Sequence, residues 1–239
     1  MQTILDSGRG VIVNSAATLT ELADYAAARA VALPPTVLAP LAVPQLPRPA
    51  APLLDKPYFV MLGTIEPRKN HWLLLQLWRQ IIATLGCAAP CLVVIGQRGW
   101  ECEHVVNLLE RCDALRGYVL EEPDCSDSRL ASWLQHAQAL LFPSFAEGFG
   151  MPLTEALSLG LPVIASDLSV FREIAGDIPE YLDPLDGVGW KQMILAYADS
   201  AHPLRLAQLA RLSGFAAPTW AAHFAQVEVL LEQVNAQSV

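Results

Sequence analysis

Apolar and amphipathic segments alternate regularly along the chain from Tyr58 onward. Short continuous apolar runs predict buried strands, and these runs span residues 58–62, 91–95, 117–121, 139–143, 162–166 and 180–182. Between them, apolar residues recur at helical spacing, which predicts helices near residues 70–85, 102–112, 127–137, 151–159, 170–175 and 187–199. This alternation predicts an α/β fold, a Rossmann-like parallel sheet with helices on both faces.

The chain before Tyr58 follows a different pattern. A short apolar run at residues 11–13 predicts a strand, and Ser15 can cap a helix over about residues 16–29. Prolines are dense over residues 33–57, and such a composition favours an extended linker over a folded element.

Residues 140–155 join a predicted strand to a predicted helix through a turn that contains glycine. Pro152 favours the first turn of that helix, and Gly160 favours its end. Unpaired backbone N–H groups converge at such a helix N-terminus and bind anions. Glycine lets the chain approach a phosphate closely. The N–H groups expected to bind a diphosphate are those of Gly148, Phe149, Gly150 and Met151.

Two glutamates, Glu147 and Glu155, frame this predicted anion site with seven residues between them. A carboxylate beside a phosphate is unfavourable unless it binds something else, such as sugar hydroxyls. The pattern therefore indicates a ligand with both phosphate and polyol groups. The alternatives are purely structural roles, in which the Glu147 side chain caps the turn and Glu155 is solvated on the helix surface.

Two cations follow the first strand of the alternation. Arg68 and Lys69 precede Asn70, which can cap a helix that starts at His71. Cations at the carboxyl end of a strand and just ahead of a helix suit a diphosphate. Arg68 could equally be a surface residue paired with Glu66.

Other residues at strand ends border the same expected cleft. Gly63, Gly96 and Glu147 all fall at the carboxyl ends of predicted strands, where ligands of parallel sheets bind. Arg98 and Trp100 follow the second strand of the alternation. We interpret them as a loop arginine and a packed tryptophan.

Composition excludes several other classes of protein. Of 239 residues, 53% are hydrophobic and 16% are charged, which argues against disorder. A net charge of −9 is unfavourable for binding nucleic acid. The five cysteines include no C-x-x-C pair, so reduced thiols are expected. No metal-ligand spacing and no D-x-D sequence is present, so we expect neither a metal nor a cofactor.

The segment from Glu147 to Glu155, with Gly-Phe-Gly after the first glutamate, resembles the E-x7-E motif of retaining glycosyltransferases of the GT-B fold, glycosyltransferase family 4. Residues 58–70 and 164–174 are similar to further segments of that family. The resemblance covers roughly residues 55–235 in the family's order.

The resemblance implies a role for each candidate site residue. Glu147 is expected to be the catalytic residue, since its family counterpart binds hydroxyls of the donor sugar and helps to position the anomeric carbon. Glu155 is expected to bind the ribose and Lys69 the donor phosphates. Donor-binding residues also include Gly63 and the turn at residues 148–151. The family often has an arginine where this chain has Thr64, and Arg68 can take its place.

The resemblance also divides the chain into three parts. Residues 1–56 would be the end of an N-terminal domain plus a linker, residues 57–215 the nucleotide-sugar-binding domain, and residues 216–239 a helix that crosses back. Nearly all of the acceptor-binding domain would lie outside this chain. A saccharide or lipid-linked acceptor would bind there, so we expect no transfer by the isolated chain.

The last predicted helix has an apolar stripe formed by Trp220, Phe224, Val227, Leu231 and Val234. By resemblance it packs on the N-terminal domain, whereas an ordinary amphipathic helix would pack on its own domain. An exposed interdomain face of this kind can also support self-association.

Residues 63–70 and 96–100 resemble bacterial family members that build O-antigen or capsule, often from GDP-mannose. The resemblance therefore implies a hexosyltransferase donor domain for cell-surface polysaccharide synthesis. It implies a cytoplasmic location, with or without peripheral attachment to the inner membrane. A GT-B-type UDP-sugar epimerase and a non-catalytic sugar-nucleotide-binding module are the alternatives.

Overall fold

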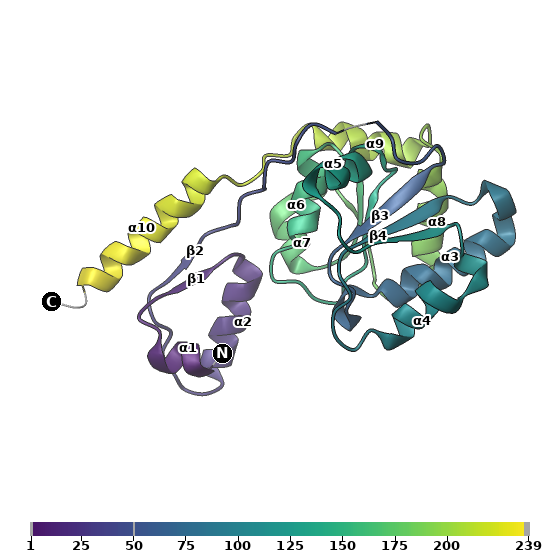
Figure 1. The fold of residues 1–239 in the computed structure, drawn as a ribbon. Helices are drawn as coiled ribbons and strands as arrows, with labels where there is room; N and C mark the ends of the chain where they lie inside the picture. The colour runs from purple at the N-terminus through teal and green to yellow at the C-terminus, as the bar shows by residue number, and fades with distance from the viewer. Residues whose placement is uncertain (1, 50, 237–239) are drawn as a thin grey trace.

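The computed structural model describes residues 2–49 and 51–236 and is built around a parallel sheet (Figure 1). Its six strands lie in the order β5-β4-β3-β6-β7-β8 and are all parallel. The strands are β3 (Tyr58–Leu62), β4 (Cys91–Ile95), β5 (Val119–Glu122), β6 (Leu140–Phe142), β7 (Val163–Ser166) and β8 (Glu180–Leu182). The predicted fold class and all six predicted strands are confirmed.

Helices cover both faces of this sheet because alternate strand residues point to opposite sides. In β3, Tyr58 and Val60 belong to one apolar core, whereas Phe59 and Met61 belong to the other. The helices of the first core are α5 (Asp127–His136), α6 (Met151–Ser158), α7 (Ser169–Ala175) and α9 (Pro203–Leu212). Those of the second are α3 (His71–Leu85), α4 (Glu103–Arg111) and α8 (Gly187–Ala198).

Helix α9 is absent from the sequence prediction, and its buried face explains why. The Gln208 side chain is fully buried, and its Nε2 donates to the Val163 carbonyl over 2.6 Å and to the Ile178 carbonyl over 3.0 Å. Leu204 and Leu206, in contrast, are exposed. Because a polar residue is buried and two leucines are exposed, the apolar residues of α9 do not mark a single buried face at helical spacing.

The N-terminal segment forms a small unit of its own. It contains α1 (Gln2–Ser7), β1 (Val11–Val13), α2 (Ala16–Ala27) and β2 (Thr36–Leu38), and β1 pairs with β2 in parallel. Ser15 caps α2 as predicted, since its hydroxyl accepts from the Thr18 N–H. The prediction of a linker throughout residues 33–57 is wrong at β2, because these three residues pair with β1.

Helix α10 (Trp220–Ala236) crosses back to this N-terminal unit and packs against β2 (Figure 1). The His223 Nδ1 atom lies 3.1 Å from the carbonyl oxygens of Ala39 and Pro40. Leu230 is buried, and its side chain lies against Gly10 of the N-terminal unit. The alternative of packing on the large sheet is therefore wrong.

The predicted apolar stripe of α10 divides between two sides of the helix. Val227 and Val234 are partly buried, whereas Trp220, Phe224 and Leu231 are 49%, 55% and 56% exposed. Self-association through this exposed part stays a prediction. All five cysteines are free, as expected. Among the described residues, no helix is both long and apolar enough to cross a membrane.

Two glycines with positive φ give a test of the fold. Gly96 has φ +144°, and a Cβ there would lie 2.3 Å from the Gly63 carbonyl oxygen, whereas Gly160 has φ +74° and open space around it. We expect Gly160→Ala to lower the free energy of unfolding by about 1 kcal/mol. Gly96→Ala should lower it by at least about 3 kcal/mol, since backbone overlap adds to strain. Urea unfolding measures the free energy of unfolding of both variants. Equal losses in the two variants would contradict the close approach of Gly96 to the Gly63 carbonyl.

Candidate functional site

The site lies where the strand order reverses. Strand β3 has β4 on one side and β6 on the other, so the loops after β3 and β6 leave the same edge of the sheet side by side. Ligands of open parallel sheets bind at such a switch point. The two loops are also joined directly, because the Phe145 N–H donates to the Arg68 carbonyl over 2.9 Å.

Glu147 is the centre of an ion-pair network at this edge. Its Oε1 accepts from Lys69 Nζ over 2.6 Å and its Oε2 lies 2.7 Å from an Arg68 guanidinium nitrogen. The Ser144 hydroxyl donates to Oε1 over 2.8 Å. The side chains of Lys69 and Glu147 are only 9% and 7% exposed, so this pair is shielded from water.

The backbone ahead of α3 delivers Lys69 to this position. Residues Pro67–Lys69 form a single 3₁₀ turn, and Asn70 then takes a left-handed conformation with φ 61°. The predicted side-chain cap by Asn70 is wrong, because its Nδ2 donates to the Pro184 carbonyl over 3.0 Å. Asparagine tolerates the left-handed region better than most residues, and this turn directs Lys69 past Gly63 toward Glu147.

Arg68 makes the ion pair with Glu66 that the sequence suggested, and it also pairs with Glu147. Its guanidinium bonds Glu66 Oε1 over 2.6 Å as well as Glu147. Glu66 Oε2 in turn accepts from the Trp100 indole N–H over 3.1 Å. Arg68 is therefore a bridge between the two glutamates.

The loop after β4 differs from the prediction in one residue. The expectation of a packed tryptophan is wrong, since Trp100 is 60% exposed and its indole N–H donates to Glu66 at the surface. Arg98 is a loop arginine as interpreted, because it pairs with Glu110 and Glu121 over 2.6 and 2.8 Å.

The turn after Glu147 presents backbone N–H groups at the start of α6. Within the described residues, the N–H groups of Gly148, Phe149, Gly150 and Met151 donate to no backbone carbonyl. Gly150 has φ +104°, and a Cβ there would lie 2.7 Å from a ring carbon of Phe171. Only glycine therefore lets the turn pack this closely. The arrangement leaves four donors for an anion at a helix N-terminus.

Glu155 lies farther along α6 and is half-buried. Burial, together with the negative charge of Asp127, raises the pKa of its carboxyl group to about 7. Strongly shifted pKa values are frequent among carboxyl groups at functional sites. No direct bond joins Glu155 to the network around Glu147 in the described part of the chain.

His71 follows Asn70 beneath the network and is almost fully buried. Burial, with a contribution from the positive charge of Lys69, lowers its pKa to about 3, so the imidazole stays neutral at physiological pH. His71 thus adds no charge to the site. Among the described residues, no group of three or more His, Cys, Asp or Glu side chains could hold a metal ion.

Sequence reasoning missed the hydroxyl groups that support the site. Ser144 is fully buried against Glu147. Ser15 Oγ and Thr18 Oγ1, from the N-terminal unit, lie 2.7 and 3.1 Å from the Gly148 carbonyl oxygen. The contacts of Ser15 and Thr18 link residues more than one hundred positions apart, and no local pattern in the sequence indicates them.

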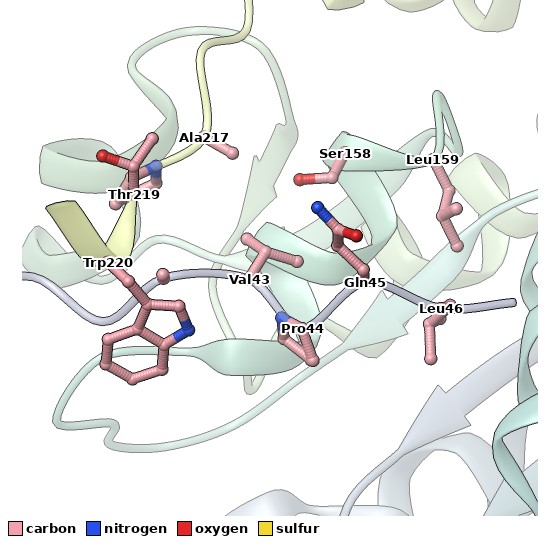
Figure 2. A pocket seen from close by; sticks show the side chains of 11 residues that line it. Val43, Pro44, Gln45, Leu46, Ser158, Leu159, Ala217, Thr219 and Trp220 are labelled. Atoms are coloured by element: carbon pink, nitrogen blue, oxygen red, sulfur yellow. The ribbon is translucent and has the colours of Figure 1, made fainter.

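A cavity of about 630 Å³ lies away from this network, between the two segments that cross from the sheet to the N-terminal unit (Figure 2). Its lining is apolar or uncharged and consists of residues 42–46, Ser158, Leu159 and residues 217–220. It offers no cation for a phosphate. Chemistry rather than cavity size therefore identifies the candidate site.

Comparison with known proteins gives a consistent result. The family model for glycosyl transferases group 1 matches residues 45–178. The O-antigen chain mannosyltransferase B of Escherichia coli is 34% identical over 150 residues, which cover 60% of this chain and 39% of that protein. A serotype-specific mannosyltransferase, WbdA, of Escherichia coli is 34% identical over 161 residues, which cover 64% of this chain and 19% of that protein.

Solved structures agree in fold. The sucrose-phosphate synthase from Thermosynechococcus elongatus superimposes with a TM-score of 0.73 at 23% sequence identity, over 99% of this chain and 61% of that one. The chain thus spans less than half the length of the first two relatives and most of one solved structure. Because the family model covers more than half of the chain, this protein belongs to the glycosyl transferases group 1 family.

Proposed function

We propose that this chain binds a nucleotide-diphosphate sugar and supplies the donor site of a retaining hexosyltransferase. The observation that carries the proposal is that two cations, a buried carboxylate and a turn lie at one switch point of the sheet, and that four N–H groups of this turn donate to no backbone carbonyl in the part of the chain that the structure describes. This set of groups matches a ligand that has both a diphosphate and a polyol part.

The binding step is an exchange of partners. In the free chain Lys69 and Arg68 neutralise Glu147. The diphosphate takes over both cations and accepts from the N–H groups of residues 148–151. Glu147 is then free to accept from hydroxyls of the donor sugar and to hold the anomeric carbon in place. No buried charge is left without a partner at either stage, which matters because an unpaired buried charge is costly.

The relatives favour mannose as the sugar and a polysaccharide as the product. The proteins matched at about one third identity are named mannosyltransferases, and one of them is named for the O-antigen chain. We therefore propose GDP-mannose as the donor and cell-surface polysaccharide synthesis as the process. The acceptor would bind to a part of the enzyme that the relatives possess beyond the matched region. The 239-residue chain alone should then transfer no sugar, because orientation of the acceptor is lacking.

Calorimetric titration of the chain with GDP-mannose, UDP-glucose, ADP-glucose and dTDP-glucose tests the proposal. We expect saturable binding, tightest for GDP-mannose. A thermal shift gives an independent reading, since a ligand at 100 times its dissociation constant adds about 2.7 kcal/mol to the free energy of unfolding. Absence of binding by all four compounds would contradict the proposed function, whereas preference for another donor would change only the base or the sugar.

Glu147→Gln tests the exchange of partners. The substitution keeps the shape of the side chain but no longer neutralises Lys69 and Arg68. Affinity for GDP should therefore rise about two- to tenfold at low salt, and less at high salt, where screening weakens the cations. Thermal stability of the free chain should fall, because Lys69 is left buried without its partner.

Glu110→Gln is the matched control for that experiment. It makes the same change in net charge and also breaks an arginine ion pair, the one to Arg98 at 2.6 Å. Its affinity for GDP should equal that of the unmodified chain. An equal rise in both variants would mean that overall charge, and not the Glu147 network, controls binding.

Glu155→Gln should have opposite effects on stability and on binding. A carboxyl whose pKa rises from 4.5 to about 7 on folding contributes stability below pH 4.5, and this contribution is lost as pH rises to 7. The variant should therefore melt higher than the unmodified chain at pH 8, with no such gain near pH 4.5. Affinity for GDP-mannose at pH 8 should fall about tenfold, since a charge-assisted bond to the ribose is lost.

Melting curves over pH 4.5–8 and calorimetry at pH 8 measure the two effects. Glu228→Gln, at an exposed position on α10, is the control and should change neither. A stability difference that does not vary with pH would contradict the pKa assignment, and unchanged affinity would contradict the role at the ribose.

A further inference from the structure

The first turn of α2 is attached to the turn that follows Glu147. Ser15 is fully buried, and its Oγ lies 2.7 Å from the Gly148 carbonyl oxygen. Thr18 Oγ1 lies 3.1 Å from the same oxygen and 2.9 Å from Ser15 Oγ. Two hydroxyls of the N-terminal unit thus converge on one backbone carbonyl of the candidate site.

Glu173 of α7 holds the same helix end at a second point. Its Oε1 accepts from the Ala16 N–H over 2.7 Å, and its Oε2 accepts from the Ala17 N–H over 3.2 Å. A carboxylate is stabilising there, because the N-terminus of a helix carries partial positive charge. Attachment at two points, to the turn and to α7, fixes both the position and the direction of α2 relative to the site.

Through the geometry of the peptide bond, the contact at the Gly148 carbonyl also orients the next backbone N–H group. The carbonyl of Gly148 and the N–H of Phe149 belong to one planar trans unit, in which they point in opposite directions. A carbonyl that is held toward α2 therefore turns the Phe149 N–H away from α2. That N–H donates to no backbone carbonyl in the described structure, and the Phe149 side chain is buried, which limits rotation on its other side.

We propose that Ser15 and Thr18 are positioning residues that orient the Phe149 amide toward the diphosphate, with Glu173 holding α2 in place for them. This inference rests on the proposed function, because it requires a diphosphate at the turn. It assigns a role in donor binding to the N-terminal unit, which lies outside the sheet that carries the other candidate residues.

Thr18→Val is the sharpest test, since valine keeps the shape of threonine and removes only the hydroxyl. Thr18→Ser restores the hydroxyl. Thr20→Val is the matched control on the same helix, because the Thr20 hydroxyl donates to the Ala16 carbonyl and, among the residues that the structure describes, makes no bond to Gly148. We expect calorimetric affinity for GDP and for inorganic pyrophosphate to fall about two- to tenfold in Thr18→Val, and to stay unchanged in the other two variants.

The ¹³C′ resonance of Gly148 supplies a readout that needs no ligand. Loss of a donor to its oxygen should move this resonance upfield in Thr18→Val and not in Thr20→Val. Glu173→Ala should move it too, because α2 is released, whereas Glu173→Gln keeps one acceptor and should move it less.

The outcomes separate this inference from the proposed function. If the unmodified chain binds neither GDP nor pyrophosphate, the proposed function is wrong and the positioning role falls with it. If the unmodified chain binds and Thr18→Val binds equally well, only the positioning role is overturned. A Gly148 resonance that is the same in Thr18→Val as in the unmodified chain would overturn the contact itself.

Discussion

The buried ion pair between Lys69 and Glu147 constrains the whole arrangement around it. Two charges removed from water lose hydration that their mutual attraction restores only in good geometry and with further hydrogen bonds. The 2.6 Å contact has both, since Ser144 and Arg68 satisfy the same carboxylate. Lys69 follows β3 and Glu147 follows β6, so the pair requires these two strands to be neighbours although almost eighty residues separate them. The sheet order β4-β3-β6 meets that requirement.

The centre of the sheet was predictable because the strands β3, β4, β6 and β7 are almost entirely buried. Parallel strands covered by helices read as continuous apolar runs, and β4 is buried at all five positions. The strands and most helices therefore follow from local pattern alone. Each exception has an identifiable cause. Gln208 interrupts the apolar face of α9, and β2 is a short strand within a proline-rich segment. The exposed Trp100 was misjudged because its contact to Glu66 comes from another strand end.

Some residues of the candidate site were also recognisable from local pattern, and others were not. Glu147, Lys69 and the glycine turn were recognisable because each sits at a fixed offset from a strand or helix end. The contacts that hold these groups in place were not recognisable from the sequence. The hydroxyl of Ser15 reaches Gly148 across more than one hundred residues, and the cap by Glu173 joins α7 to α2. Such contacts depend on how two units of the fold meet, which no window of the sequence records. Sequence pattern thus identifies groups that bear chemistry better than groups that orient them.

The turn at Gly148 therefore has to satisfy two demands during the proposed exchange of partners. Glu147 must leave Lys69 and Arg68 when a diphosphate arrives, yet the N–H groups next to it must stay in place to bind that diphosphate. A turn held only through the Glu147 side chain would be released at the moment when its donors are needed. The Gly148 carbonyl is held instead by Ser15 and Thr18, which take no part in the exchange. The backbone donors can then remain fixed while the side chain between them and Lys69 changes its partner.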